Sequence, residues 1–180
     1  MSISMSSPPS SADATLTAFL QTAPGSVADT WYAYKPLPLC TVPLEAATES
    51  RGELPDRLSV YGWRYLVRSG ELMGVADVHE DGDHWLVMRF ATGEPASALA
   101  RASCAAEATS HPEGEYEAMI LDWRELGINA LYLRGRAIDD LVFDVWTGMP
   151  SPQTAREFWA GATMNAALLK SSRAEQQSRD

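Results

Sequence analysis

Two dipeptides, Ser69-Gly70 and Asp81-Gly82, divide residues 58–90 into three runs of β-forming residues. Glycine accepts the positive φ that tight hairpin turns require, so each dipeptide predicts a two-residue turn between antiparallel strands. Three strands joined by two such turns form a meander. Residues 58–90 therefore predict a three-stranded antiparallel meander, and the rest of the fold must be built around it.

The turns also predict which side chains share a face of this meander. With two residues in each turn, His79 lies opposite His84, and a slip of one residue would invert the faces. One predicted face is apolar and is expected to face the core; it carries Tyr61, Trp63, Tyr65, Val67, Leu72, Gly74, Ala76, Val78, Trp85 and Val87. The other face carries Arg64, Arg68, Glu71, Asp77, His79 and His84 among apolar residues. We expect this mixed face to be exposed or half covered by another element, with its arginines in surface ion pairs.

The flanking segments predict helices and further strands. Helices are expected near residues 12–22, 94–109 and 152–170, and three more strands within 115–146. Residues 94–109 are rich in alanine, whose small side chain lets a helix lie close to a sheet. Residues 31–44 contain three prolines, which donate no hydrogen bond, so they are expected to be extended or edge chain, and 45–57 a loop.

These elements together predict an α+β fold in a single domain. We expect residues 11–170 to form one curved antiparallel sheet with helices on its concave face, enclosing a core of ordinary size for this length. Residues 1–10 are rich in serine and proline and are expected to be a disordered tail, and residues 171–180 a frayed one.

Composition excludes several classes of partner. The formal net charge is −10 and the basic residues are scattered, so neither nucleic acid nor an anionic membrane surface is an expected partner. No stretch is long and apolar enough to span a bilayer, and the first residues lack the pattern of a signal peptide. Cys40 and Cys104 have no metal-ligand spacing. They could form one disulfide, but we expect two buried thiols in a reducing compartment. A cytoplasmic protein is therefore predicted.

Standard cofactor and catalytic motifs are absent from the sequence. No two glycines are spaced two apart, which rules out GxGxxG, and neither GxxxxGK nor GxSxG occurs. The stretch HEDGDH at residues 79–84 is one residue too long for the zincin motif HExxH, and its Asp-Gly pair would break the helix that motif needs. No cofactor and no catalytic residue is therefore predicted.

Two candidate sites remain. The predicted register places Asp77, His79 and His84 on one face, where they could form a metal site of two histidines and a carboxylate, or an acid–base cluster; the alternative is a set of soluble turn residues. A ligand pocket between sheet and helices could use Tyr61, Trp63, Tyr65 and Trp85 as walls, with a carboxylate such as Asp122, Asp140 or Asp144 as general base. The alternatives are simple core packing for the aromatic residues and solvent exposure for the acids.

These observations leave three functional hypotheses. The first is an acidic interaction protein, such as an accessory, inhibitor or immunity-type partner of a basic protein, which could also pair with itself as a homodimer. Trp31 and Trp146 lie near expected edges and could anchor such a partner. The second is a small-ligand-binding or enzymatic domain that uses the pocket, and the third is the metal site.

Overall fold

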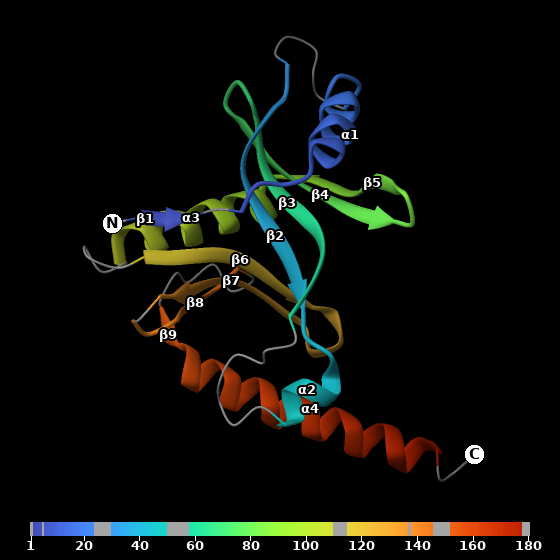
Figure 1. The fold of residues 1–180 in the computed structure, drawn as a ribbon, viewed down its shortest axis with the longest axis vertical. Helices are drawn as coiled ribbons and strands as arrows, with labels where there is room; N and C mark the ends of the chain where they lie inside the picture. Colours follow the sequence, from blue (N-terminus) through green and yellow to red (C-terminus); the bar gives the residue numbers. More distant parts are fainter. Residues whose placement is uncertain are drawn as a thin grey trace.

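A single mixed sheet runs through the molecule (Figure 1). The computed structural model describes residues 2–4, 6–23, 30–49, 58–109, 115–136, 138–145 and 152–177. Within these residues the strands follow the order β5-β4-β3-β2-β6-β7-β8-β9, and β1 pairs with β6. Neighbouring strands are antiparallel except for the β2–β6 and β1–β6 pairs. The predicted α+β class is confirmed.

Strands and helices are interspersed along the chain. The strands are β1 (Ser2–Ser4), β2 (Tyr32–Thr41), β3 (Ser59–Ser69), β4 (Leu72–Asp81), β5 (His84–Thr92), β6 (Glu115–Trp123), β7 (Ile128–Gly135), β8 (Leu141–Asp144) and β9 (Gln153–Thr154). The helices are α1 (Ser10–Leu20), α2 (Leu44–Glu49), α3 (Glu94–Thr109) and α4 (Ala155–Gln177), with a short 3₁₀ helix η1 (Arg124–Leu126). The three predicted helices and the predicted strands are present.

Three segments differ from the expected organisation. Strand β1 lies in the stretch expected to be a disordered tail, where it pairs in parallel with β6. Helix α2 lies in a stretch expected to be a loop, and α4 continues to Gln177, into the stretch expected to fray. None of the described helices is long and apolar enough to cross a membrane.

The predicted meander is present as β3, β4 and β5, but each turn lies one residue further along the chain. Ser69 pairs with Leu72 and Asp81 with His84, so Gly70 and Gly82 are the first central residues of their turns, both with positive φ. A glycine with positive φ at this position is the requirement of a type II′ turn. The predicted pairing of His79 with His84 is therefore wrong, because His79 lies opposite Leu86.

The predicted faces remain correct despite this shift. Moving a turn by one residue changes the partner of each residue near it by two positions, and side chains alternate between the faces with period two. Trp63, Tyr65 and Val78 are buried beneath α1, together with its Leu16. The two ends of the predicted apolar face are exceptions: Leu72 is exposed beside its turn, and Tyr61 belongs to the cluster on the opposite side of the sheet.

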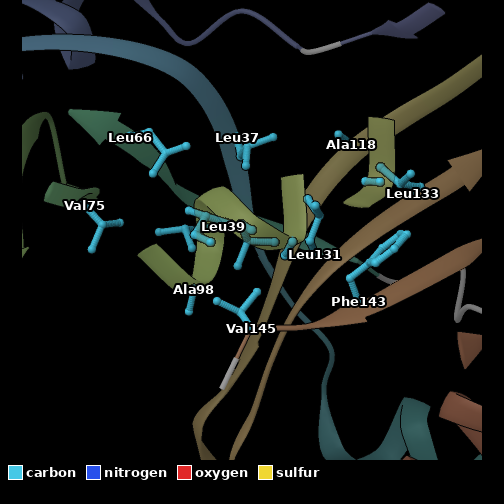
Figure 2. Close-up of a cluster of buried hydrophobic side chains, with 14 of the residues drawn as sticks. Leu37, Leu39, Leu66, Val75, Ala98, Ala118, Leu131, Leu133, Phe143 and Val145 are labelled. Atoms are coloured by element: carbon cyan, nitrogen blue, oxygen red, sulfur yellow. The ribbon is translucent and has the colours of Figure 1, made fainter. Parts of the chain in front are cut away.

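The mixed face of the meander is covered more completely than predicted. Helix α3 lies between the two halves of the sheet and contacts β3, β4 and β5 on one side and β7 and β8 on the other. Figure 2 shows leucines and valines of both halves around this helix. Its buried residues are mainly alanines, which allow this close approach, as predicted. Arg64 and Asp77 lie within this layer and are not at the surface, whereas His84 is exposed.

Strand β2 is the central strand and not an edge. It pairs with β3 along its length, and its Leu39 and Cys40 also pair with β6 (Figure 1). Pro36 and Pro38 precede this junction, in the part of β2 that pairs with β3 alone, so their missing N–H groups interrupt no second ladder. The other side of β6, β7 and β8 is covered by α2 and α4, where Trp159 is fully buried.

The two cysteines differ in exposure. Both are free thiols, but Cys40 is buried whereas Cys104 is exposed on α3, which corrects the prediction of two buried thiols. Burial raises the pKa of Cys40 to about 11, so this thiol stays protonated at neutral pH.

Candidate functional site

An open hollow of about 470 Å³ lies where β3, β4 and β6 approach the start of α2. Its apolar part is formed by Val42, Pro43, Leu44 and Trp123. Its polar part is formed by Thr41, Tyr61, His79, Asp122, Arg124 and Glu125. A concave surface of this size that combines apolar side chains with several polar groups has the composition of a ligand site.

A β-bulge places Tyr61 in this hollow. Leu39 pairs with Gly62 and Cys40 with Val60, so Tyr61 is an extra residue of β3. Such a bulge redirects the side chain of the extra residue. Tyr61 therefore leaves the apolar face predicted for it and packs against His79, with ring centroids 5.0 Å apart and planes at 80°.

The position of His79 depends on the glycine opposite it. Gly62 pairs with His79, and a Cβ atom on Gly62 would lie 2.6 Å from the Val78 carbonyl oxygen and 2.9 Å from His79 Cδ2. Both distances are too short for any side chain at this position. Glycine in the strand interior therefore allows the imidazole to lie against the backbone of β3.

Tyr61 and Asp122 form a hydrogen-bonded pair across the junction of the two sheet halves. The Tyr61 hydroxyl donates to Asp122 Oδ2 at 2.7 Å, and Arg124 Nε lies 3.6 Å from the same oxygen. Burial, followed by the hydrogen bond to Asp122 and its negative charge, raises the pKa of Tyr61 far above its usual value. The phenol is therefore a fixed donor at neutral pH.

His79 is a neutral imidazole with an unsatisfied nitrogen. Burial lowers its pKa, against the opposing effect of the Asp77 carboxylate, so the ring is uncharged at pH 7. Its Nε2 atom is buried and has no hydrogen-bond partner among the described residues. An unpaired buried polar group costs about 1–3 kcal/mol, which makes His79 the member of the site that gains most from a new partner.

A buried ion pair lies on the same side of β3 and β4 as His79. Arg64 Nε donates to Asp77 Oδ1 at 2.7 Å and Arg64 Nη2 to Asp77 Oδ2 at 2.8 Å, while Arg64 Nη1 donates to Asn129 Oδ1 at 2.9 Å. Both charged side chains are 3 % exposed. The predicted pairing of these residues is correct, but the predicted surface location is wrong, because α3 and β7 cover them. Arg68 and Glu71 do form the expected exposed pair.

The predicted metal residues do not come together. Asp77 binds Arg64 through both carboxylate oxygens, and His84 is exposed opposite Asp81 at the hairpin tip. Within the described ranges no group of three His, Cys, Asp or Glu side chains is close enough to hold a metal ion. Of the three, His79 alone lines the hollow.

The predicted aromatic pocket is also divided. Tyr61 lines the hollow, whereas Trp63, Tyr65 and Trp85 belong to the core beneath α1. No free space lies above Gly74 on this face, because a Cβ atom there would lie 2.9 Å from Val67 Cγ2 and 3.4 Å from Trp31 Cζ3.

The other aromatic and acidic candidates have structural partners. Trp31, expected near an edge, is buried against Phe90, and Trp146 lies outside the described residues. Tyr65 lines another open hollow, of about 640 Å³, between α1 and β2. Its hydroxyl donates a hydrogen bond to Asp13, which also lines that hollow, at 2.9 Å. Asp140 accepts hydrogen bonds from the Tyr132 hydroxyl and the Gly135 N–H.

Sequence reasoning named Tyr61, His79 and Asp122 separately but did not bring them together. Their meeting depends on the bulge in β3 and on the contact between β2 and β6, which together bring Tyr61 to Asp122, 61 residues further along the chain. Gly62, inside a run of β-formers, was the available signal, since such a glycine marks a bulge or a close approach. Arg124 and Asn129 carried no sequence signal.

Comparison with known proteins adds no family to this description. No protein-family model, no curated protein and no solved structure matches the chain. Its function must therefore be inferred from the geometry and chemistry of the hollow itself.

Proposed function

We propose that the protein binds a small cyclic amide, a ring that carries adjacent N–H and C=O groups, in the hollow beside Tyr61 and His79. The observation that carries this proposal is the pair formed by Asp122 and Arg124. A carboxylate oxygen and a guanidinium nitrogen 3.6 Å apart present an acceptor beside a donor. This pattern is complementary to a lactam edge, whose N–H would donate to Asp122 and whose carbonyl would accept from Arg124.

The rest of the hollow supports a ring as the body of the ligand. Val42, Pro43 and Leu44 provide apolar contact, and Tyr61 provides an aromatic ring in the same lining. The volume of about 470 Å³ lies in the range of small-molecule sites, roughly 300–1,000 Å³. His79 is a further partner for a polar ring substituent, which its imidazole would meet by turning toward the hollow.

Binding of 2-pyridone, followed by amide chemical shifts in ¹H–¹⁵N NMR spectra, tests this proposal. We expect it to shift the signals of Gly62, His79 and Asp122, and N-methyl-2-pyridone, which lacks the N–H donor, to bind at least ten times more weakly. Equal binding of the two compounds, or no shift in this region at millimolar concentration, would refute the proposal.

Two exposed arginines provide a matched pair of variants. Arg124 and Arg136 each lie 3.6 Å from a carboxylate, but only Arg124 lines the hollow. Loss of a charge-assisted hydrogen bond of about 1.5 kcal/mol predicts a Kd for 2-pyridone about ten times higher in Arg124→Gln. Arg136→Gln should leave the Kd unchanged, and an equal effect of both variants would mean that general charge, not the hollow, controls binding.

A second function, the acidic interaction protein, is favoured by the outer edge of the sheet. Strand β5 pairs with β4 alone among the described strands, and its Leu86 and Met88 are exposed. An open edge with exposed apolar side chains can add an extended segment of another chain. The acids Glu80, Asp81 and Asp83 at the adjacent tip and the net charge of −10 favour a basic segment.

Self-association at the same edge can be distinguished from binding of a basic partner. Light scattering after size exclusion measures the mass of the wild type and of Met88→Lys at micromolar concentration. A dimer lost in Met88→Lys would assign the edge to a second copy. If both proteins are monomers, a basic partner remains as the occupant of the edge. Its test is binding of an extended peptide that contains oligolysine, and Met88→Lys should weaken this binding. Failure of both measurements would reject this second function.

A further inference from the structure

A second cavity, of about 90 Å³, lies between α3 and the sheet. Its lining is mainly apolar and consists of Ile3, Leu37, Ala106, Ala118, Leu131 and Leu133, with the hydroxyl-bearing Ser103 of α3 beside them. Figure 2 shows Leu37, Ala118, Leu131 and Leu133 projecting from β2, β6 and β7 around α3. Protein cores contain few voids larger than a water molecule, and an apolar cavity stays dry and accepts apolar ligands. This cavity opens to solvent beside Lys35 and Glu107, so a small apolar group can enter it from the surface.

Lys35 and Glu107 place charge at the mouth of this cavity. Both line it while remaining partly exposed, and Lys35 Nζ lies 2.6 Å from Glu107 Oε1 on α3. The Lys35 ammonium has three donors, so it can bind a second carboxylate without releasing Glu107. The cavity thus combines a mainly apolar lining with a cation at its entrance.

The backbone of Lys35, at the mouth of this cavity, is strained. Lys35 has a φ of 48° and is the only non-glycine residue with positive φ among the described residues. It lies at a bulge of β2 between Tyr34 and Pro36, and a residue that precedes proline ordinarily takes an extended conformation. Left-handed backbone costs a residue of this type about 1–2 kcal/mol. Strain of this kind persists where the surrounding structure imposes it and clusters at ligand sites.

We infer that this cavity binds a short aliphatic carboxylate, with the hydrocarbon chain inside and the carboxylate on the Lys35 ammonium. An engineered cavity of roughly 150 Å³ holds benzene, so a cavity of about 90 Å³ holds roughly three or four carbon atoms. Butyrate has this size and charge. The site is lined by none of the residues of the hollow, so it stands independently of the function proposed above.

Binding of butyrate, measured from methyl signals of Leu131 and Leu133 in ¹H–¹³C NMR spectra, tests the inference. We expect saturable shifts at millimolar butyrate, and at least tenfold weaker binding of butyramide, which lacks the charge. Octanoate, which is too long for the cavity, should bind more weakly than butyrate. The absence of methyl shifts, or equal binding of butyrate and butyramide, would overturn the inference.

Three variants separate the site from general effects. Lys35→Met should raise the Kd for butyrate at least tenfold, and Ala118→Val, which fills the cavity, should abolish the shifts. Arg101→Met removes another 2.6 Å ion pair of α3, with Glu94, away from the cavity and should leave the Kd unchanged. Equal losses in Lys35→Met and Arg101→Met would reject a specific role for Lys35. If Lys35→Met does not fold, the comparison of butyrate with butyramide on the wild type decides.

Discussion

Removal of the Asp77 carboxylate should be among the most destabilising single changes in this protein. In Asp77→Ala the Arg64 guanidinium remains buried at 3 % exposure and loses two hydrogen bonds, of 2.7 and 2.8 Å, together with its counter-charge. Two charge-assisted hydrogen bonds of about 1.5–3 kcal/mol each predict a loss of about 3–6 kcal/mol, which overlaps the cost of about 3–5 kcal/mol for leaving a buried charge unpaired. This loss is a large fraction of the stability of a typical domain.

Urea unfolding followed by tryptophan fluorescence measures this loss directly. With a slope of about 2.5 kcal/mol per molar urea, the midpoint should fall by roughly 1.5 M in Asp77→Ala. The control is Glu71→Ala, which removes the carboxylate of the exposed pair with Arg68 and should cost less than about 0.5 kcal/mol. Equal midpoints for the two variants would refute the claim that burial of the charge determines the cost.

A double variant distinguishes the unpaired charge from lost packing. Arg64→Met combined with Asp77→Leu replaces both charges by apolar groups of similar size. It should recover most of the stability lost in Asp77→Ala, except for about 1 kcal/mol from the Asn129 oxygen that loses its donor. A double variant as unstable as Asp77→Ala would mean that shape, and not the uncompensated guanidinium, is responsible.

Three further outcomes follow from the same structure. Gly62→Ala should cost at least about 2 kcal/mol in urea unfolding, because its Cβ atom would meet the Val78 carbonyl oxygen at 2.6 Å, and should shift the His79 ring signals; wild-type stability would refute the close approach. The pKa of His79 is lower in the folded chain than its ordinary 6.5, so its contribution to stability is present above pH 6.5 and is lost as the pH falls through the folded pKa. His79→Gln should flatten that part of the stability curve, and an unchanged curve would contradict the assignment. A thiol reagent at neutral pH should label Cys104 alone in the native protein and Cys40 only after unfolding, and two labels on the native chain would contradict the burial of Cys40.

The meander shows how far local sequence carries a prediction and where it stops. Ser69-Gly70 and Asp81-Gly82 located both hairpins, because a tight turn depends on the backbone freedom of one glycine. They did not determine whether that glycine is the first or the second central residue. The true register therefore differs by two residues in each pairing predicted near the turns, with a further bulge in the β4–β5 pairing at Asp77 and Val78. The faces were right although the partners of His79 and His84 were wrong.

Errors about burial arose where distant segments meet. Nothing near Arg64 or Asp77 in the sequence indicates that the alanine-rich α3 covers them, and an Arg–Asp pair has the same local pattern in water and in a core. The prolines of β2 correctly exclude a strand paired on both sides along its whole length. They do not exclude the short junction with β6 that makes β2 the central strand.

The amino-acid sequence by itself determined the α+β class, the position of each principal helix and the apolar face of the meander, because these depend on residue spacing and turn chemistry within short segments. Only the tertiary structure decided the sites. The hollow requires Tyr61 to meet Asp122, and the second cavity requires Lys35 to meet Glu107. Such contacts between distant residues depend on one bulge in β3, one in β2 and the junction of β2 with β6. The free energy that selects them comes from packing of the whole chain.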